Sequence, residues 1–243
     1  MIHLSNLHMT DIEHMNWAVY FEENHAQRLQ IDFSEEPQLS PEEKELIFPS
    51  IREFQKGEAS DGRFLLKCAR RFAKKNNVPE YPAAMEWFIR EENWHSFYLK
   101  QYMDYHRVTV RDNSVLDTVF RLLRKIGGLR SEVIVLVTAE MIALPYYSAL
   151  AKCTGSAALK SICTQMLADE LRHIVFQSCT LYKMKTNPFE RLLRILFMEI
   201  TMTVVWCSMK NVFLAGGYSF RRFASECLGY LGQSIEIEKR GRL

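Results

Sequence analysis

Apolar positions recur along most of this chain at steps of three and four residues, which is the spacing of amphipathic helices. No segment alternates apolar and polar residues for long enough to indicate a β-strand. The 10 glycines and 7 prolines are few, and we expect them to fall between helices and not inside them. The pattern predicts an all-α protein, and the lack of linker composition predicts a single domain over residues 1–243.

The same pattern places the individual helices. Ser40 before Pro41, with Glu42 and Glu43 in the first turn, is typical of a helix N-terminus. The first forty residues are less regular, and no helix is assigned there. Their apolar side chains could cover the bundle or the mouth of a pocket, namely Trp17, Val19, Tyr20 and Phe21. The predicted helices cover approximately residues 41–54, 64–75, 82–106, 115–126, 131–152, 157–185, 190–214 and 220–231.

Two short motifs stand out within these helices. One reads Glu91-Glu92-Asn93-Trp94-His95 and the other Asp169-Glu170-Leu171-Arg172-His173, with their central glutamates 78 residues apart. Residues three apart share one face of a helix, so each motif offers a carboxylate and an imidazole side by side. A single Glu-x-x-His would carry little weight in a chain with 29 acidic residues, but two copies in the same form indicate a shared role.

Each motif follows another helical carboxylate at a similar distance. Glu140 precedes Glu170 by 30 residues, and Glu58 precedes Glu92 by 34. Asp61, 31 residues before Glu92, is the alternative; we favour Glu58 because its longer side chain reaches more easily into a bundle core. This is the ligand set of a two-metal carboxylate site in a four-helix bundle. The predicted metal ligands are Glu58, Glu92, His95, Glu140, Glu170 and His173.

The neighbours of these residues indicate a protein core and not a solvated surface. Apolar residues surround Glu140 on every face of its helix, so an unpaired carboxylate there would cost several kcal/mol, a cost that a metal ion removes. The alternative for Glu140 is a buried carboxylate that is hydrogen-bonded or paired with an arginine. The alternative for the two motifs is a pair of core histidines whose hydrogen bonds are satisfied within the protein. Other residues share a helix face with the predicted ligands at steps of three and four residues. They are Phe88 and Leu99 for the first motif, and Ile162, Met166 and Gln177 for the second.

The ligand types indicate iron. Carboxylates and imidazoles without a thiolate suit iron or manganese, so we predict two Fe ions, with Mn or mixed Mn/Fe as alternatives. Metal-bound imidazoles usually donate their second N–H to a carboxylate or a carbonyl. Glu91 and Asp169 are the predicted acceptors, and antiparallel helices would pair Glu91 with His173 and Asp169 with His95. The alternative is that one of the two acids is simply exposed.

Composition narrows the remaining possibilities. A net charge of +2 without a basic run does not indicate a nucleic-acid partner. No signal peptide is indicated at residues 1–11, and we expect a cytoplasmic protein. The most apolar stretch, residues 192–216, contains charges that are costly in lipid, which favours a buried or dimer-packing helix over a membrane span.

The cysteines form no C-x-x-C pair and are expected to be free thiols: Cys68, Cys153, Cys163, Cys179, Cys207 and Cys227.

On these motifs the chain resembles the ferritin-like superfamily of di-iron carboxylate proteins. The two motifs resemble those of soluble acyl-carrier-protein desaturases, E-E-N-R-H and D-E-x-R-H, with Trp94 in place of an arginine. The stretch from Gly57 to Arg63 is similar to G-E-x-S-x-G-R in uncharacterised bacterial ferritin-like proteins, which supports Glu58 as a ligand. The resemblance implies a ferritin-like four-helix bundle over about residues 50–185, with an N-terminal extension (1–40) and additional C-terminal helices (188–232).

The resemblance also implies O2 activation by two ferrous ions. Our leading hypothesis is an oxidase, oxygenase or desaturase acting on a small organic or acyl substrate, with an electron donor and a homodimeric state. The segments outside the bundle could wall a substrate pocket, with aromatic side chains of Phe88, Trp94, Tyr146 and Tyr147 near the ligands; the other interpretation of these aromatics is core packing. The alternative functions are an iron-handling ferroxidase or storage protein and a peroxide-reducing protein, neither with an organic substrate.

Overall fold

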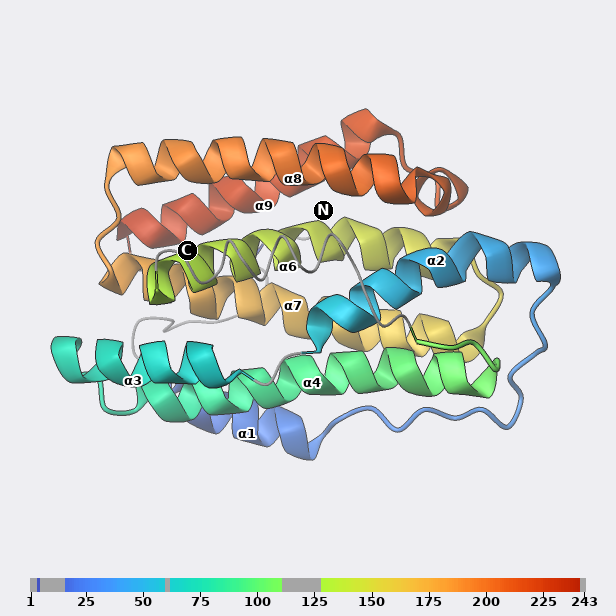
Figure 1. Cartoon of the computed structure of the whole chain (residues 1–243), viewed down its shortest axis with the longest axis horizontal. Coiled ribbons are helices and arrows are strands. Elements are labelled where there is room, and N and C mark those ends of the chain that lie inside the picture. The colour runs from blue at the N-terminus through green and yellow to red at the C-terminus, as the bar shows by residue number, and fades with distance from the viewer. Residues whose placement is uncertain (1–3, 5–15, 60–61, 111–127, 241–243) are drawn as a thin grey trace. The chain divides into compact units, whose positions relative to one another are not determined.

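The computed structural model describes residue 4 and residues 16–59, 62–110 and 128–240. These residues are mostly helical and include no β-strand (Figure 1), which confirms the all-α prediction. The ferritin-like four-helix bundle stays a prediction. The chain divides into two compact units. One contains Asn16–Glu132 and Ser156–Ile162, and the other contains Met1–Met15, Val133–Gly155 and Cys163–Leu243.

In the first unit, α4 is the element that the other helices contact. The helices are α1 (Trp17–Ala26), α2 (Pro41–Glu58), α3 (Arg63–Asn76) and α4 (Tyr81–Tyr105), and each of the first three packs on α4. Phe21 of α1 meets Phe88 of α4 edge to face, with ring centroids 6.1 Å apart. Gln55 of α2 donates its amide Nε2 to the hydroxyl of Ser96 at 3.0 Å. Phe88 and Ser96, the α4 residues in these contacts, are both buried.

In the second unit, buried contacts connect α6 (Leu129–Lys152), α7 (Ala157–Lys183), α8 (Pro188–Ala215) and α9 (Phe220–Arg240). Tyr146 of α6 packs on Phe213 of α8, and Phe213 packs on Phe223 of α9. The hydroxyls of Ser178 on α7 and Ser234 on α9 are 2.7 Å apart. The residues of α6 before Val133 and of α7 before Cys163 belong to the first unit.

Most helix boundaries agree with the prediction. Ser40 caps α2 by accepting a hydrogen bond from the backbone N of Glu43 at 3.1 Å. Asn187 and Glu190 form a capping box at the start of α8. Two differences are α1, which was not assigned, and α9, which runs to Arg240 and not to Leu231. The helix predicted at 115–126 lies outside the described residues.

The expectation that glycines and prolines fall between the helices is wrong at three glycines, Gly57 in α2 and Gly229 and Gly232 in α9, and at two prolines. Pro49 lies inside α2 and Pro145 inside α6. A proline removes one backbone hydrogen bond, which a long helix packed on its neighbours tolerates because packing contributes most of its stability. The prediction of free thiols is confirmed, since none of the six cysteines, all of which lie in the described part of the chain, forms a disulfide, and four of them are buried.

Candidate metal centre

The first motif lies on α4 with both predicted ligands turned into the core. Glu92 is nearly buried and His95 is fully buried, and the carboxylate oxygen Oε1 lies 3.8 Å from the imidazole Nδ1. The flanking residues Phe88 and Leu99 are buried as well. The apolar stripe predicted on this helix is therefore confirmed, and it is interrupted only by groups that can bind a metal.

The second motif has the same local arrangement on α7. Glu170 and His173 are buried, and Oε2 of the glutamate lies 3.3 Å from Nδ1 of the histidine. Met166 and Ile162, one and two turns before Glu170, are completely buried. Because residues three apart on a helix are neighbours, each motif presents its carboxylate and imidazole as one pair.

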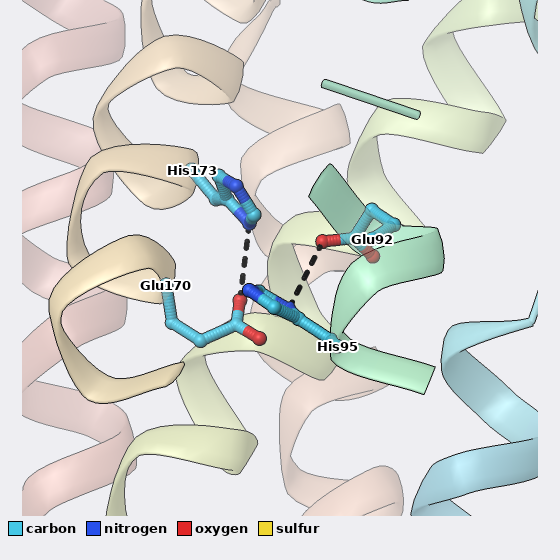
Figure 2. Close-up of side chains that lie close together, drawn as sticks. All are labelled: Glu92, His95, Glu170 and His173. Atoms are coloured by element: carbon cyan, nitrogen blue, oxygen red, sulfur yellow. Dashed lines mark ion pairs between the residues drawn. The ribbon is translucent and has the colours of Figure 1, made fainter. Parts of the chain in front are cut away.

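The four motif residues form one buried cluster. Figure 2 shows the side chains of Glu92, His95, Glu170 and His173. Each offers one ligand atom, and these four atoms lie within 4.8 Å of one another. Two carboxylates and two imidazoles are donors that suit a divalent metal such as iron, manganese or zinc. This cluster could hold a metal ion, and its donors alone do not fix which metal.

Glu140 is buried on α6 and is held by a residue of the second motif's helix. Gln177 donates its amide Nε2 to Oε1 of Glu140, and both side chains are buried. Gln177 follows His173 by four residues, so it lies on the same face of α7 as Glu170 and His173. The amide offsets part of the cost of burying a carboxylate, as the alternative interpretation of Glu140 required. Its role as a ligand stays a prediction.

Glu58 is the last residue of α2 and is partly exposed. It is not among the four residues of the cluster. Asp61, the alternative ligand, lies outside the described residues, so the choice between the two stays open.

The two acids that precede the ligand glutamates are both buried, so neither is an exposed helix acid. Glu91 accepts a hydrogen bond from the amide of Asn24 on α1. Asp169 accepts from Nε2 of Gln165 at 2.9 and 3.0 Å, one distance to each carboxylate oxygen. The crossed pairing of these acids with the motif histidines stays a prediction.

Three amide side chains were therefore missing from the predicted site. Gln165 and Gln177 could have been found, because each lies four residues from a motif residue on the same helix. Asn24 could not, since its helix was not assigned.

Three of the four aromatic residues near the motifs, Phe88, Tyr146 and Tyr147, pack in the core, whereas Trp94 is only partly buried. Tyr146 and Tyr147 are completely buried and contact each other with centroids 5.0 Å apart. Phe88 packs on Phe21, and the guanidinium of Arg28 lies over the ring of Trp94 at 4.6 Å. These contacts support the core-packing interpretation of the aromatics.

Comparison with known proteins finds no match to a protein-family model, to a curated protein or to a solved structure. The resemblance to di-iron carboxylate proteins therefore depends on the two motifs and on the burial of their residues.

Proposed function

We propose that this protein is an O2-activating di-iron oxidoreductase that acts on a small organic or acyl substrate. The observation that carries the proposal is the buried cluster of Glu92, His95, Glu170 and His173. Two glutamates buried in a core are costly unless a positive charge or hydrogen bonds compensate their carboxylates. A metal centre provides that charge.

The proposed centre contains two metal ions. Glu92 with His95 would hold one ion, and Glu170 with His173 the other. Glu140, placed by Gln177, would be a further ligand. Glu58 is the least supported of the six. When bound, two ferrous ions would supply electrons for the reduction of O2, and an external donor would be needed to restore them.

The protein's own residues would orient the ligands and exclude water. Hydrogen bonds from other residues to the ligand side chains fix the orientation of the ligands and tune a metal site. The amides of Asn24 and Gln165 hold the acids that precede the two ligand glutamates, and Gln177 holds Glu140. The two imidazoles are buried, so the protein would exclude bulk water from the site.

Anaerobic titration with Fe(II) tests the proposal. We expect about two iron ions per chain in the wild type, a stoichiometry typical of two-metal sites, and a loss of one or both in Glu170→Ala and Glu92→Ala. Mössbauer spectra before and after exposure to O2 would report the oxidation state of the bound iron. Glu86→Ala is the matched control, because Glu86 is an exposed acid of α4 that pairs with Arg90 at 2.9 Å.

Two results would contradict the proposal. One is a wild type that binds no iron, and the other is binding that Glu170→Ala leaves unchanged. If the wild type binds iron and Glu170→Ala loses it, fatty-acyl and arylamine compounds would be screened for O2 consumption by the loaded protein. Accumulation of many irons per chain in a large multi-subunit shell would instead support iron storage.

A further inference from the structure

The outer face of α8 carries a stripe of exposed apolar side chains. Six large apolar residues between positions 189 and 204 are from 42% to 66% exposed, which are Phe189, Leu192, Leu193, Leu196, Ile200 and Val204. The opposite face of α8 is buried in its own unit. There Arg194 pairs with the carboxylate of Glu238 on α9 and donates to the hydroxyl of Ser234 at 2.9 Å.

The spacing of the stripe is that of a helix-packing seam. Phe189, Leu193, Leu196 and Ile200 follow one another at steps of four, three and four, and Thr203 and the exposed Cys207 continue the same steps. Apolar residues that repeat every 3.5 positions keep one narrow face toward a partner helix. The seam stops near Met209, where the backbone of α8 departs from helical geometry with φ −131° and ψ 17°.

The stripe is large enough to support an interface. A fully exposed side chain of this size offers roughly 150–200 Å², so six that are about half exposed offer roughly 500 Å² on one copy. Two such faces would bury about 1,000 Å² from these residues alone, and the polar rim would bring the total into the range of about 1,200–2,000 Å² of stable interfaces. A patch of several hundred Å² on a soluble protein marks an interaction site.

We propose that a second copy of this chain docks on this face, with α8 packed against α8. α8 is also long and apolar enough to cross a membrane by composition, with 33% of its most apolar window buried. The buried ion pair between Arg194 and Glu238 argues against a span, because it ties one side of the helix to α9. Exposed Glu199 borders the stripe, whereas helices that lie on lipid carry Lys and Arg on their polar side.

The experiment is a measurement of molar mass by sedimentation equilibrium on the full chain. We expect a wild-type dimer and a monomeric Ile200→Glu, with at least a tenfold weaker dimer, because a charge would be buried at the middle of the seam. Val19→Glu is the matched control: Val19 is an aliphatic residue of α1 with 44% exposure, and its replacement should leave the dimer intact. Should Ile200→Glu fail to fold by circular dichroism, Phe189→Ser at the exposed end of the stripe gives the same test.

Three results would overturn the proposal. The wild type could be monomeric at high concentration, or its dimer could survive both stripe variants. The third result is a monomeric wild type that cosediments with vesicles of neutral or anionic phospholipid, together with an Ile200→Glu variant that does not. It would make this face a membrane-binding surface. None of these depends on the metal centre, so the two proposals can fail separately.

Discussion

At the scale of single residues, His106 at the end of α4 shows how burial controls the charge of a side chain outside the two motifs. Its Nε2 lies 3.6 Å from Oε1 of Glu36, and both side chains are fully buried. The other oxygen of Glu36 accepts a hydrogen bond from the backbone N of Ala158 in the first turn of α7 at 3.1 Å. Glu36 therefore satisfies a helix N-terminus, where a negative charge is favourable. Burial lowers the pKa of His106, and Glu36 opposes this shift.

This lowered pKa predicts the direction of a pH effect on stability. A histidine that is harder to protonate in the folded state than in the unfolded chain leaves the unfolded state with more bound protons. Stability is then complete above the ordinary pKa of 6.5 and declines as the pH falls below that value. Besides Glu36, the charged groups that act on this imidazole are Lys44, which lowers the pKa, and Glu43, which raises it.

Urea unfolding at pH 7.5 and pH 5.5 measures the effect. The free energy of unfolding of the wild type should fall more between these pH values than that of His106→Gln, which cannot gain the proton. Parallel changes in the two proteins would show that His106 does not contribute to the pH dependence.

The metal cluster shows which residues of a site can be predicted from the sequence. Glu92, His95, Glu170 and His173 were predicted because a helix turns a three-residue spacing into contact. Glu58 was favoured over Asp61 as the fourth carboxylate, but the two are three residues apart, so a helical pattern places both on one face and does not decide between them. In the structure Glu58 is the final residue of α2. The amide donors depend on tertiary contacts, which the pattern of one helix does not specify.

At the scale of helices, Gly216 marks a close approach between α8 and α6. A Cβ at this position would lie 2.4 Å from the backbone oxygen of Ala149 and 2.6 Å from its Cα. Backbone atoms cannot move aside as the end of a flexible side chain can. The absence of a side chain at Gly216 therefore allows the end of α8 to pack on α6.

Replacing Gly216 by alanine should therefore destabilise the fold by about 1–3 kcal/mol, the usual cost of overpacking. Gly232→Ala is the matched control, because a Cβ there meets nothing within 4 Å and the residue lies inside α9. That control should be neutral or stabilising by about 0.4–1 kcal/mol. Chemical denaturation of both variants gives the comparison, and equal stabilities would show that the helices separate easily at this point.

The helices also show where sequence patterns fail. The periodic segments of α2, α3, α4, α6, α7 and α8 were predicted because a long apolar stripe identifies them. α1 has a single buried residue, Phe21, so its helix depends on packing against α4 and has no stripe of its own. The end of α9 was missed because it buries Ser234 and Glu238, polar residues whose partners lie on α7 and α8.

At the scale of the whole molecule, the sequence predicted the helical class but not which helices pack together. Local periodicity specifies a helix and its apolar face, whereas the division into two compact units depends on contacts between residues distant in sequence. The expectation of one ferritin-like domain therefore stays a prediction. The stability of the whole chain gives a way to test the metal centre without measuring a reaction.

Metal binding should raise the stability of the entire protein. A ligand that binds the folded state alone adds about 2.7 kcal/mol at a free concentration of 100 times Kd, which corresponds to a rise of about 5–10 °C in Tm for a chain of this length. Mn(II) is suitable because the cluster's carboxylates and imidazoles also suit manganese and no reaction with O2 has to be excluded. Calorimetry with Mn(II), and then with excess chelator, should show the rise and its reversal.

The variant Glu170→Ala should lose this rise in Tm, because one of the four buried ligands is removed, while the exposed-site control Glu86→Ala should keep it. The comparison separates a metal held by the cluster from metal bound loosely at surface acids, since only the first depends on Glu170. A rise that persists in Glu170→Ala would assign the bound metal to other groups. Equal Tm values for the wild type with Mn(II) and with chelator would mean that the cluster does not hold this metal under the conditions used.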